Sequence, residues 1–255
     1  MSNQIIALKN QNVLVAAPKT PSFVCPMFLV RKSDQSNRPI FNLKNLNNYV
    51  SQMKFRLINM NKIPDFLQER DWAIKIDLTQ AYFHIPVARS HQPFLRVLYK
   101  LDKAQNDPEL LQITCLPFGL SSAPKAFATV SNWIAQLLRS MGLRVIVCLD
   151  DFLIVNQDRR LLKHQAAEAI RVLNSLGWTI NSEKCILVPT RIIEYLGITW
   201  NLERHSKYLP TSKKSKILCK IMNTLNNNQW SLKDAQSVLG ILNFAAFVVQ
   251  RGRLH

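Results

Sequence analysis

The sequence predicts an α+β fold, built on an antiparallel sheet with helices packed against it. Two apolar, β-branched runs flank Asp150-Asp151, which is the pattern of a hairpin with a two-residue loop. The segment 72–76 alternates like another strand and places Asp77 where the strand pattern ends. Amphipathic helical patterns follow both regions, so we expect a sheet that is backed by helices.

The N-terminal part is predicted to contain a basic hairpin. Residues 1–22 carry little pattern and are expected to form a loosely held lead-in. Residues 23–30 read as a strand, in which Pro26 favours an edge position. The turn-rich loop 31–38 carries three cations, and a return strand begins at Pro39. A loop of this kind fits either a solvated turn or a site for an anionic ligand.

Short elements are predicted in the middle of the chain. The pattern predicts a short amphipathic helix over 60–70. It also predicts a strand over 94–99, a polar loop over 101–110 and a second strand over 111–115. Pro124 lies in the first turn of a longer helix, which Ser121 or Ser122 can cap and which ends at Gly142.

The C-terminal part combines a further helix, strand and turn material, and a basic helical region. Residues 161–176 form a second amphipathic pattern that ends at Gly177. Residues 178–185 and 192–198 read as strand and turn. A helix start is predicted at Ser231, which Asp234 follows at the spacing of a capping box.

The charge distribution indicates a polyanionic partner. The net charge is +17, and it divides into +7 over 1–60 (eight Lys/Arg, one acid), +2 over 61–203 (sixteen and fourteen) and +8 over 204–255 (nine and one). Basic ends around an acidic middle suit a carboxylate centre that works beneath a nucleic acid, although a solvated basic surface would give the same count.

The cysteines and the hydropathy pattern narrow the setting. The five cysteines show no C-x-x-C pair, so we interpret them as reduced, in a protein that is intracellular, either cytoplasmic or nuclear. No segment is long and apolar enough to span a bilayer, and no membrane role is expected. All six glycines are isolated, which disfavours the phosphate loop of a kinase or ATPase.

The two adjacent acids can be interpreted in two ways. Asp150 and Asp151 could simply form the hairpin turn, since Asp is a common turn residue. Alternatively, the hairpin lifts two carboxylates out of an apolar sheet, where metal ions or cationic partners would offset their repulsion. The upstream Asp77, at another strand end, favours the second interpretation.

The order of these motifs resembles that of a known family. Asp77 is followed by Leu-Pro-Phe-Gly-Leu at 116–120 and then by Asp150-Asp151, the order found in polymerase palms. The chain resembles reverse transcriptases over about residues 23–250, particularly those of LTR retrotransposons and of tyrosine-recombinase retroelements. The resemblance implies a palm with fingers over 23–203 and a thumb with the start of a connection over 204–255.

The resemblance also implies site residues. The catalytic group would be Asp77, Asp150, Asp151 and Lys184. The acids, together with Leu78, would hold two Mg²⁺ ions, for which Mn²⁺ could substitute. Neighbouring side chains of an extended backbone point to opposite faces, so Asp151 should be less directly placed than Asp150 unless the turn rotates it inward. Further positions would bind the nucleotide (Lys32, Arg38, Tyr82, Phe118, Gly119), grip the primer (Tyr195, Leu196, Gly197) and contact the nucleic-acid backbone (Lys213, Lys214, Lys216).

The implied function is RNA-directed DNA polymerisation on a primed RNA or DNA template, with deoxynucleoside triphosphates as substrates. The sequence leaves the natural template and the oligomeric state open. The chain departs from the family pattern at Asn42 and Lys44, where an acid and an arginine are usual, and at Cys148, where many relatives have tyrosine. The alternative is a captured retroelement protein that binds nucleic acid without catalysis, but such a protein would gain nothing from three acids facing a polyanion.

Overall fold

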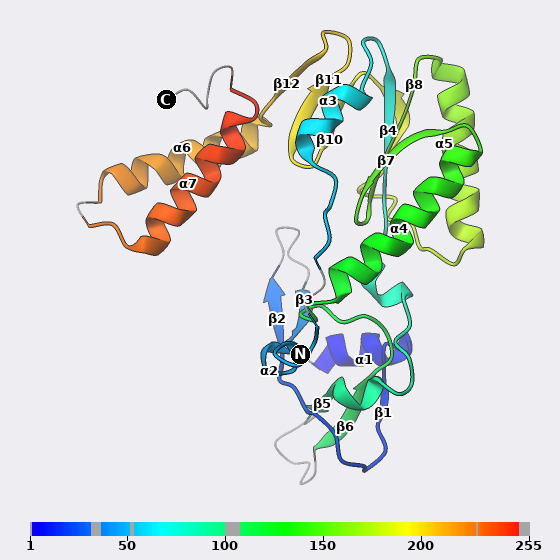
Figure 1. Ribbon diagram of the computed structural model, residues 1–255, viewed down its shortest axis with the longest axis vertical. Helices are drawn as coiled ribbons and strands as arrows, with labels where there is room; N and C mark the ends of the chain where they lie inside the picture. The colour runs from blue at the N-terminus through cyan, green and yellow to red at the C-terminus, as the bar shows by residue number, and fades with distance from the viewer. Residues whose placement is uncertain (1, 32–36, 52–53, 100–107, 228, 250–255) are drawn as a thin grey trace.

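The computed structural model describes residues 2–31, 37–51, 54–99, 108–227 and 229–249. It confirms the α+β class: helices and antiparallel sheets form a palm, a smaller region below it in the view, and a pair of helices that extends to one side (Figure 1). Within the described residues no helix is long and apolar enough to cross a membrane.

The palm is a four-stranded antiparallel sheet in the order β7-β8-β4-β9. Its strands are β4 (Trp72–Asp77), β7 (Arg144–Cys148), β8 (Asp151–Asn156) and β9 (Ile186–Thr190). The predicted β7–β8 hairpin and the predicted Asp77 strand therefore pair side by side. The register places Asp77 opposite Asp151.

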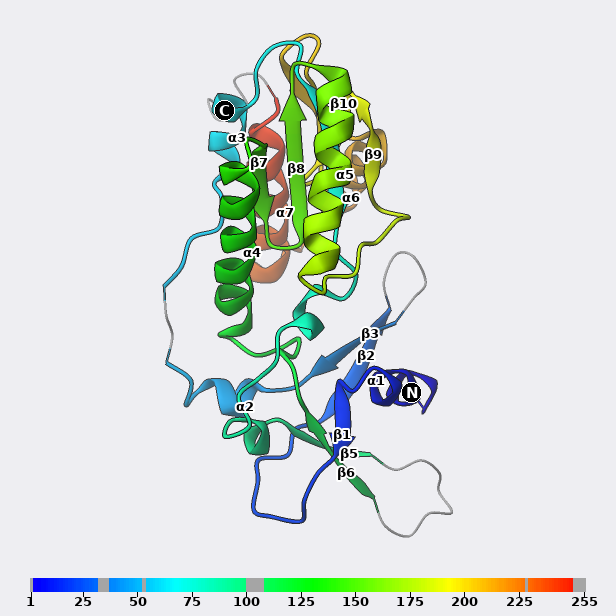
Figure 2. The same cartoon turned by 90° about the vertical axis from the view of Figure 1, so that its right-hand side faces the viewer.

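Two hydrophobic clusters sandwich this sheet, because successive side chains of a strand point to opposite faces. Ile74 and Ile76 pack under helices α4 (Ala123–Ser140) and α5 (Arg159–Ser175), which lie side by side over one face (Figure 2). Ala73 packs on the other face, against the three-stranded sheet of β10 (Ile192–Tyr195), β11 (Ile198–Asn201) and β12 (Ser206–Tyr208). The acids at the strand ends are thus carried by a rigid, doubly covered support.

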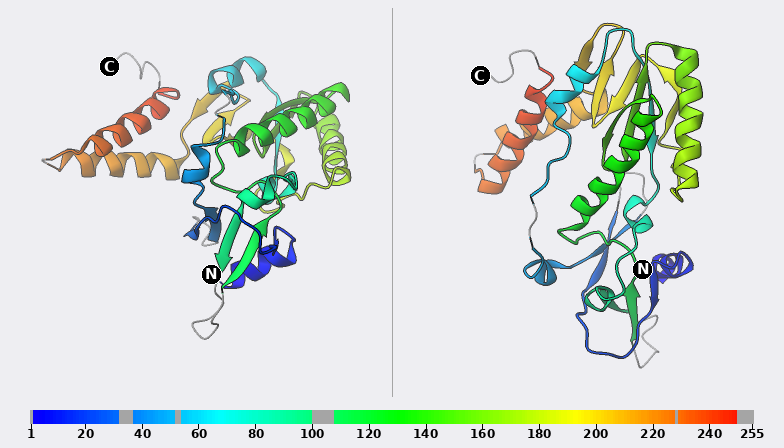
Figure 3. Two further views of the ribbon diagram at one scale, coloured as in Figure 1. Left: turned by 60° about the horizontal axis from the view of Figure 1, so that its bottom comes forward. Right: turned by 45° about the vertical axis from the view of Figure 1, so that its right-hand side comes forward.

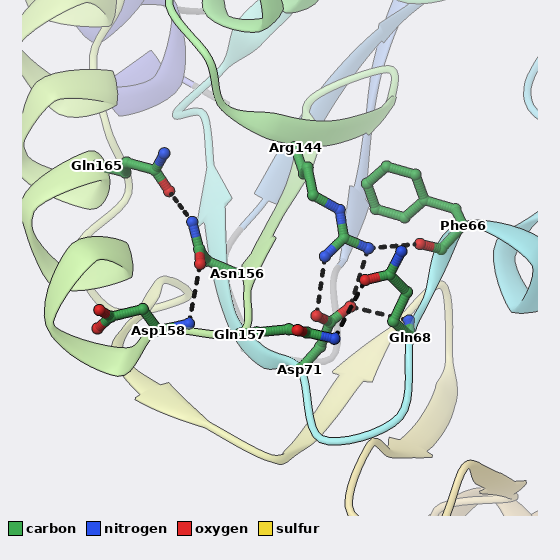
Figure 4. A network of polar contacts seen from close by, with 8 residues as sticks. All are labelled: Phe66, Gln68, Asp71, Arg144, Asn156, Gln157, Asp158 and Gln165. Carbon is green, nitrogen blue, oxygen red and sulfur yellow. Dashed lines mark hydrogen bonds and ion pairs between the residues drawn. The ribbon is translucent and has the colours of Figure 1, made fainter.

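An ion pair between the buried Asp71 and the partly exposed Arg144 fastens the end of the sheet that lies away from Asp77 and Asp150. Asp71 is fully buried and accepts hydrogen bonds from Arg144 at 2.8 and 3.1 Å and from the Gln68 N–H at 2.9 Å (Figure 4). Arg144 also donates to the Phe66 carbonyl at 2.9 Å. Because both carboxylate oxygens have partners, the Asp71 charge can be buried without being left unpaired.

The N-terminal segment corrects the expectation of a loosely held lead-in over 1–22. Helix α1 (Ser2–Asn10) buries Ile5 and Leu8, and strand β1 (Leu14–Ala16) pairs with β6 (Glu109–Ile113). Lys9 forms an ion pair with Glu109 at 2.6 Å. The segment is held because its apolar side chains meet partners about a hundred residues away, which no local pattern reveals.

The rest of the smaller region follows the prediction in outline. Strands β2 (Met27–Arg31) and β3 (Asn37–Phe41) form the predicted hairpin, although β2 begins four residues later than expected. Strand β5 (Arg96–Tyr99) pairs with β6. Short helices complete this part of the chain: α2 (Lys44–Asn47), η2 (Ala81–His84) and η3 (Gln92–Phe94).

The predicted helix over 60–70 is shorter than expected. It comprises one 3-10 turn, η1 (Met60–Lys62), and α3 (Ile63–Phe66), after which Leu67 is extended. Most of the predicted loop 101–110 lies outside the described residues, but β6 already begins at Glu109. Helix α4 begins at Ala123 with Pro124 in its first turn, as expected, but Ser122 at the N-cap position makes no side-chain capping hydrogen bond. Helix α5 begins two residues early because Asp158 caps it.

The C-terminal helices are α6 (Thr211–Leu225) and α7 (Leu232–Ala246), and they pack against each other away from the helices that cover the palm (Figure 3). The predicted start of α7 is confirmed: Ser231 and Asp234 form a complete capping box.

Candidate active site

The hairpin that carries the acids turns one residue earlier than the sequence suggested. Its loop is Leu149-Asp150, and Asp151 is already the first residue of β8, paired with Cys148. Leu149 has φ +55°, a left-handed backbone that is costly for a leucine. The strained turn therefore holds Asp150 at the tip, and the sheet holds Asp151.

This register brings the third acid to the same place. Asp77 is the last residue of β4 and lies directly opposite Asp151, so their side chains share one face of the sheet. We expected Asp151 to be less directly placed than Asp150 unless the turn rotated it inward, and the register places Asp151 opposite Asp77.

The electrostatics of the group show an excess of negative charge. Burial raises the pKa of Asp77, as do the two neighbouring carboxylates, whereas Lys184 and Lys75 lower it. Burial also raises the pKa of Asp150, its own backbone hydrogen bond lowers it, and Asp151 raises it again. Ionised carboxylates so close together destabilise one another unless cations join them.

One carboxylate oxygen of the group has no hydrogen bond that would offset this repulsion. Asp151 Oδ1 is buried without a hydrogen-bond partner, and the cation nearest to it is Lys75, whose Nζ lies 3.6 Å away. Carboxylate oxygens of this kind suit Mg²⁺, which commonly takes one or two carboxylates plus substrate phosphates. Among the described residues, no group of three or more His, Cys, Asp or Glu side chains is arranged so that it could hold a metal ion.

Lys184 lies on a turn next to the end of β4 that carries Asp77. Its charge lowers the pKa of both Asp77 and Asp150, while its side chain is exposed. Next to it, Cys185 was not singled out from the sequence. Its Sγ accepts the Asp77 backbone N–H at 3.2 Å.

Three of the residues expected to bind a nucleotide come together beside Asp150. The Tyr82 ring lies 4.9 Å from the Phe118 ring between centroids, and the Arg38 guanidinium lies 5.1 Å from the Phe118 centroid. Burial raises the pKa of Tyr82, and the Asp150 charge adds to the shift. Lys32, another of the five expected residues, lies outside the described residues.

Gly119 is held where only glycine fits. It has φ +111°, and a Cβ there would collide with the Phe41 carbonyl oxygen. Asn47 fastens this loop: its amide donates to the Gly119 carbonyl at 2.9 Å and its Oδ1 accepts the Ser121 N–H at 2.9 Å. The sequence shows Asn47 in a polar run, but nothing local predicts its partner, 72 residues away.

The expected primer-grip residues form the turn between β10 and β11. Leu196 and Gly197 both have positive φ, at +52° and +72°, as a two-residue hairpin turn requires. Tyr195 precedes the turn, is fully buried, and donates its hydroxyl to the Asp151 carbonyl at 3.2 Å. This turn is therefore tied to the hairpin that carries the acids.

One expected backbone contact is already engaged within the protein. Lys213 on α6 donates to the Gly197 carbonyl at 3.2 Å, and its Nζ lies 4.1 Å from the centroid of the Phe244 ring on α7. Lys214 and Lys216 are exposed. A phosphate contact by Lys213 stays a prediction, and the exposed pair is better placed to make one.

A protein-family model and two retroviral polyproteins match the chain. A model of the family described as "Reverse transcriptase (RNA-dependent DNA polymerase)" matches residues 30–200. The chain is 25% identical over 183 residues to the Gag-Pol polyproteins of Rous sarcoma virus subgroup B (strain Schmidt-Ruppin) and of avian leukosis virus subgroup A (isolate RSA). These matches cover 69% of the chain but 11% of each polyprotein.

Solved structures of similar fold come from foamy virus. A foamy viral protease-reverse transcriptase in complex with double-stranded DNA matches 96% of the chain and 40% of its own, with a TM-score of 0.77 and 19% identity. A complex of the foamy viral protein with an RNA/DNA hybrid covers 96% of the chain and 30% of its own, with a TM-score of 0.73 and 21% identity.

Proposed function

Because the chain belongs to the reverse transcriptase (RNA-dependent DNA polymerase) family, we propose that it extends a primer on an RNA or DNA template, using deoxynucleoside triphosphates. The observation that carries this proposal is the register of the palm sheet, in which Asp77 faces Asp151 beside Asp150 in a strained turn. Buried carboxylates that repel one another destabilise a fold, and such groups cluster at functional sites.

The proposed reaction is phosphoryl transfer from the triphosphate to the primer 3′-hydroxyl, with pyrophosphate as the leaving group. Two Mg²⁺ ions, or Mn²⁺ in their place, would neutralise the attacking and leaving oxygens when bound. Asp77 and Asp150 would be their principal ligands, with Asp151 and the Leu78 backbone carbonyl beside them. The raised pKa of both principal acids supports this assignment, because burial and the neighbouring carboxylates disfavour the ionised form, which a bound cation would stabilise.

The remaining residues would orient the substrates. Arg38, with Lys32, would hold the triphosphate, and Lys184 would face the leaving phosphates from the turn beside Asp77. Tyr82 would lie under the sugar. The contact between Arg38 and the Phe118 ring supports a nucleotide pocket between the β2–β3 hairpin and the palm.

We further propose a division into fingers and palm over 23–203 and a thumb over 204–255, with residues 1–22 packed onto the fingers. The net charge of +8 over 204–255 and the exposed Lys214 and Lys216 support a thumb that grips the nucleic-acid backbone. The foamy viral proteins of similar fold were solved with double-stranded DNA and an RNA/DNA hybrid.

Primer extension by the purified chain tests the proposal, with Mg²⁺ and with RNA and DNA templates in parallel. Asp77→Asn and Asp150→Asn should each abolish extension and leave nucleic-acid binding intact or slightly tighter, because a repulsive carboxylate is neutralised. Asp65→Asn, at an exposed acid on α3, is the matched control and should extend normally. Binding without any extension by the unaltered chain would favour the alternative of a captured, non-catalytic protein.

A further inference from the structure

We propose that Cys185 is a positioning residue for the polymerase reaction, its thiol fixing the backbone of Asp77 and the turn that carries Lys184. The inference rests on the proposed function for its catalytic consequence. Its structural part stands on contacts between the thiol and Asp77 that can be tested without activity.

The thiol contacts both polar backbone groups of Asp77. Cys185 Sγ accepts the Asp77 N–H at 3.2 Å and lies 3.7 Å from the Asp77 carbonyl oxygen, to which it can donate. Asn181 donates its own N–H to that carbonyl at 2.9 Å. A single side chain thus links the end of β4 to a segment 108 residues further along the chain.

A side-chain acceptor is needed there because the ladder between β4 and β9 is interrupted. Its registered pairs are Ala73 with Thr190 and Lys75 with Ile186, with an irregularity between them, and Asp77 lies beyond the last pair. An interior strand would satisfy the Asp77 N–H with a carbonyl of its neighbour. Here the Cys185 sulfur takes the place of that carbonyl, since β9 has not yet begun.

The same residue also closes the turn next to Lys184. The Cys185 N–H donates to the Asn181 carbonyl at 3.1 Å, and the Lys184 N–H donates to the same oxygen at 3.2 Å. The Cys185 side chain packs against the hydrophobic cluster beneath the palm helices. The thiol therefore ties the backbone at the end of β4 to the core and to the turn from which the Lys184 side chain extends.

Removing the thiol should loosen the end of β4 and the turn that carries Lys184, while Asp77 and Lys184 themselves stay in place in the sequence. In Cys185→Ala the Asp77 N–H loses its acceptor, and the strand end gains freedom that a two-metal site does not tolerate, since reacting groups must hold their positions closely. Cys185→Ser keeps a donor and an acceptor on a shorter side chain, so it should retain most of the order that the thiol gives to the Asp77 backbone. Cys219→Ala, at an exposed thiol on α6, is the matched control.

Hydrogen exchange of individual amides gives the readout that is independent of activity. Exchange of the Asp77 amide should accelerate about tenfold or more in Cys185→Ala, and by much less in Cys185→Ser, as expected when a protein hydrogen bond is removed or weakened. The Ile74 amide, deep in the same strand, should not change. An Asp77 amide that exchanges equally in the unaltered chain and in Cys185→Ala would overturn the proposal.

Kinetics then separate a positioning role from a purely structural one. In Cys185→Ala the Mg²⁺ concentration for half-maximal extension should rise about threefold to tenfold, the range of one hydrogen bond, and Cys185→Ser should restore it. A fall in rate that only follows the unfolded fraction, with unchanged Mg²⁺ dependence, would refute positioning. If the unaltered chain extends no primer, the proposed function fails, and the Asp77 exchange rate still decides whether Cys185 holds this backbone.

Discussion

Replacing Tyr195 by phenylalanine should weaken the link between the Leu196–Gly197 turn and the acid-bearing hairpin. The substitution keeps the buried ring and deletes only the hydroxyl that donates to the Asp151 carbonyl at 3.2 Å. Burial raises the pKa of this hydroxyl, so it stays a protonated donor throughout the usable pH range. Its loss leaves the Asp151 carbonyl without this partner.

The expected cost is about 1 kcal/mol for the missing hydrogen bond, rising to about 3 kcal/mol if the carbonyl finds no other partner. In a chain of this size, each kcal/mol corresponds to about 2–4 °C in Tm. Urea denaturation should show a lower midpoint with an unchanged m-value, equally in mildly acidic and mildly alkaline buffer. Primer extension should slow as well, because Asp151 begins the strand that faces Asp77.

Tyr49→Phe is the matched control, since Tyr49 is 88% exposed and should tolerate the same change without effect. Unfolding curves of Tyr195→Phe that coincide with those of this control would refute the reasoning. So would a stability loss that leaves the extension rate untouched, because the hydroxyl would then support the core but not the acid hairpin.

Three further outcomes are expected. Tyr82→Ala should raise ribonucleotide incorporation relative to deoxyribonucleotide incorporation, by about tenfold for each 1.4 kcal/mol of clash between the ring and the 2′-hydroxyl that is relieved. Single-nucleotide insertion measures this ratio, and an equal loss of both activities would mean that the ring only supports the fold. Replacing Lys214 and Lys216 together by alanine should flatten the slope of log K against log salt by about 0.7–0.9 for each phosphate that the protein no longer neutralises, and an unchanged slope would make them a solvated face. In metal-free buffer near neutral pH, Asp77→Asn should raise the free energy of unfolding, because burial and the Asp151 charge raise the native pKa of Asp77 and the ionised carboxyl opposes folding. That gain should shrink as the pH falls through the raised pKa towards the ordinary carboxyl value, where the native acid is already protonated; a gain that grows on acidification would contradict the sign.

The palm was predictable because its signals are local. Alternation in 72–76 and the β-branched runs around Asp150 set the strand type, and helical periodicity set α4 and α5. Once the two acid-bearing segments are strands of one sheet, their apolar faces leave few other pairings. The strands themselves were therefore predictable, whereas the expectation that Asp77 and Asp150 meet came from the resemblance to reverse transcriptases.

The supporting contacts were not predictable, since each joins residues far apart in the chain. Cys185 meets Asp77 across 108 residues, and the Tyr195 hydroxyl meets the Asp151 carbonyl across 44. Neither contact leaves a periodic or compositional trace, because a thiol and a phenol also suit an ordinary core. The exact turn was missed for another reason: Leu149 is a poor residue for a left-handed backbone, and a propensity argument places the polar pair in the loop instead.

That mismatch is itself informative about how the site is maintained. A leucine at φ +55° and mutually repelling acids both oppose folding, and local preference would relieve both by moving the turn one residue onward. Such a move would change the pairing of β7 with β8 by two residues and would take Asp151 out of its pair with Cys148 and into the loop. The packed pairs Val147–Phe152 and Ile146–Leu153, one in each buried cluster, stabilise the observed register, and that register requires the strained leucine and the facing carboxylates. Stability contributed by the core holds the acids in an arrangement that their own chemistry would not choose.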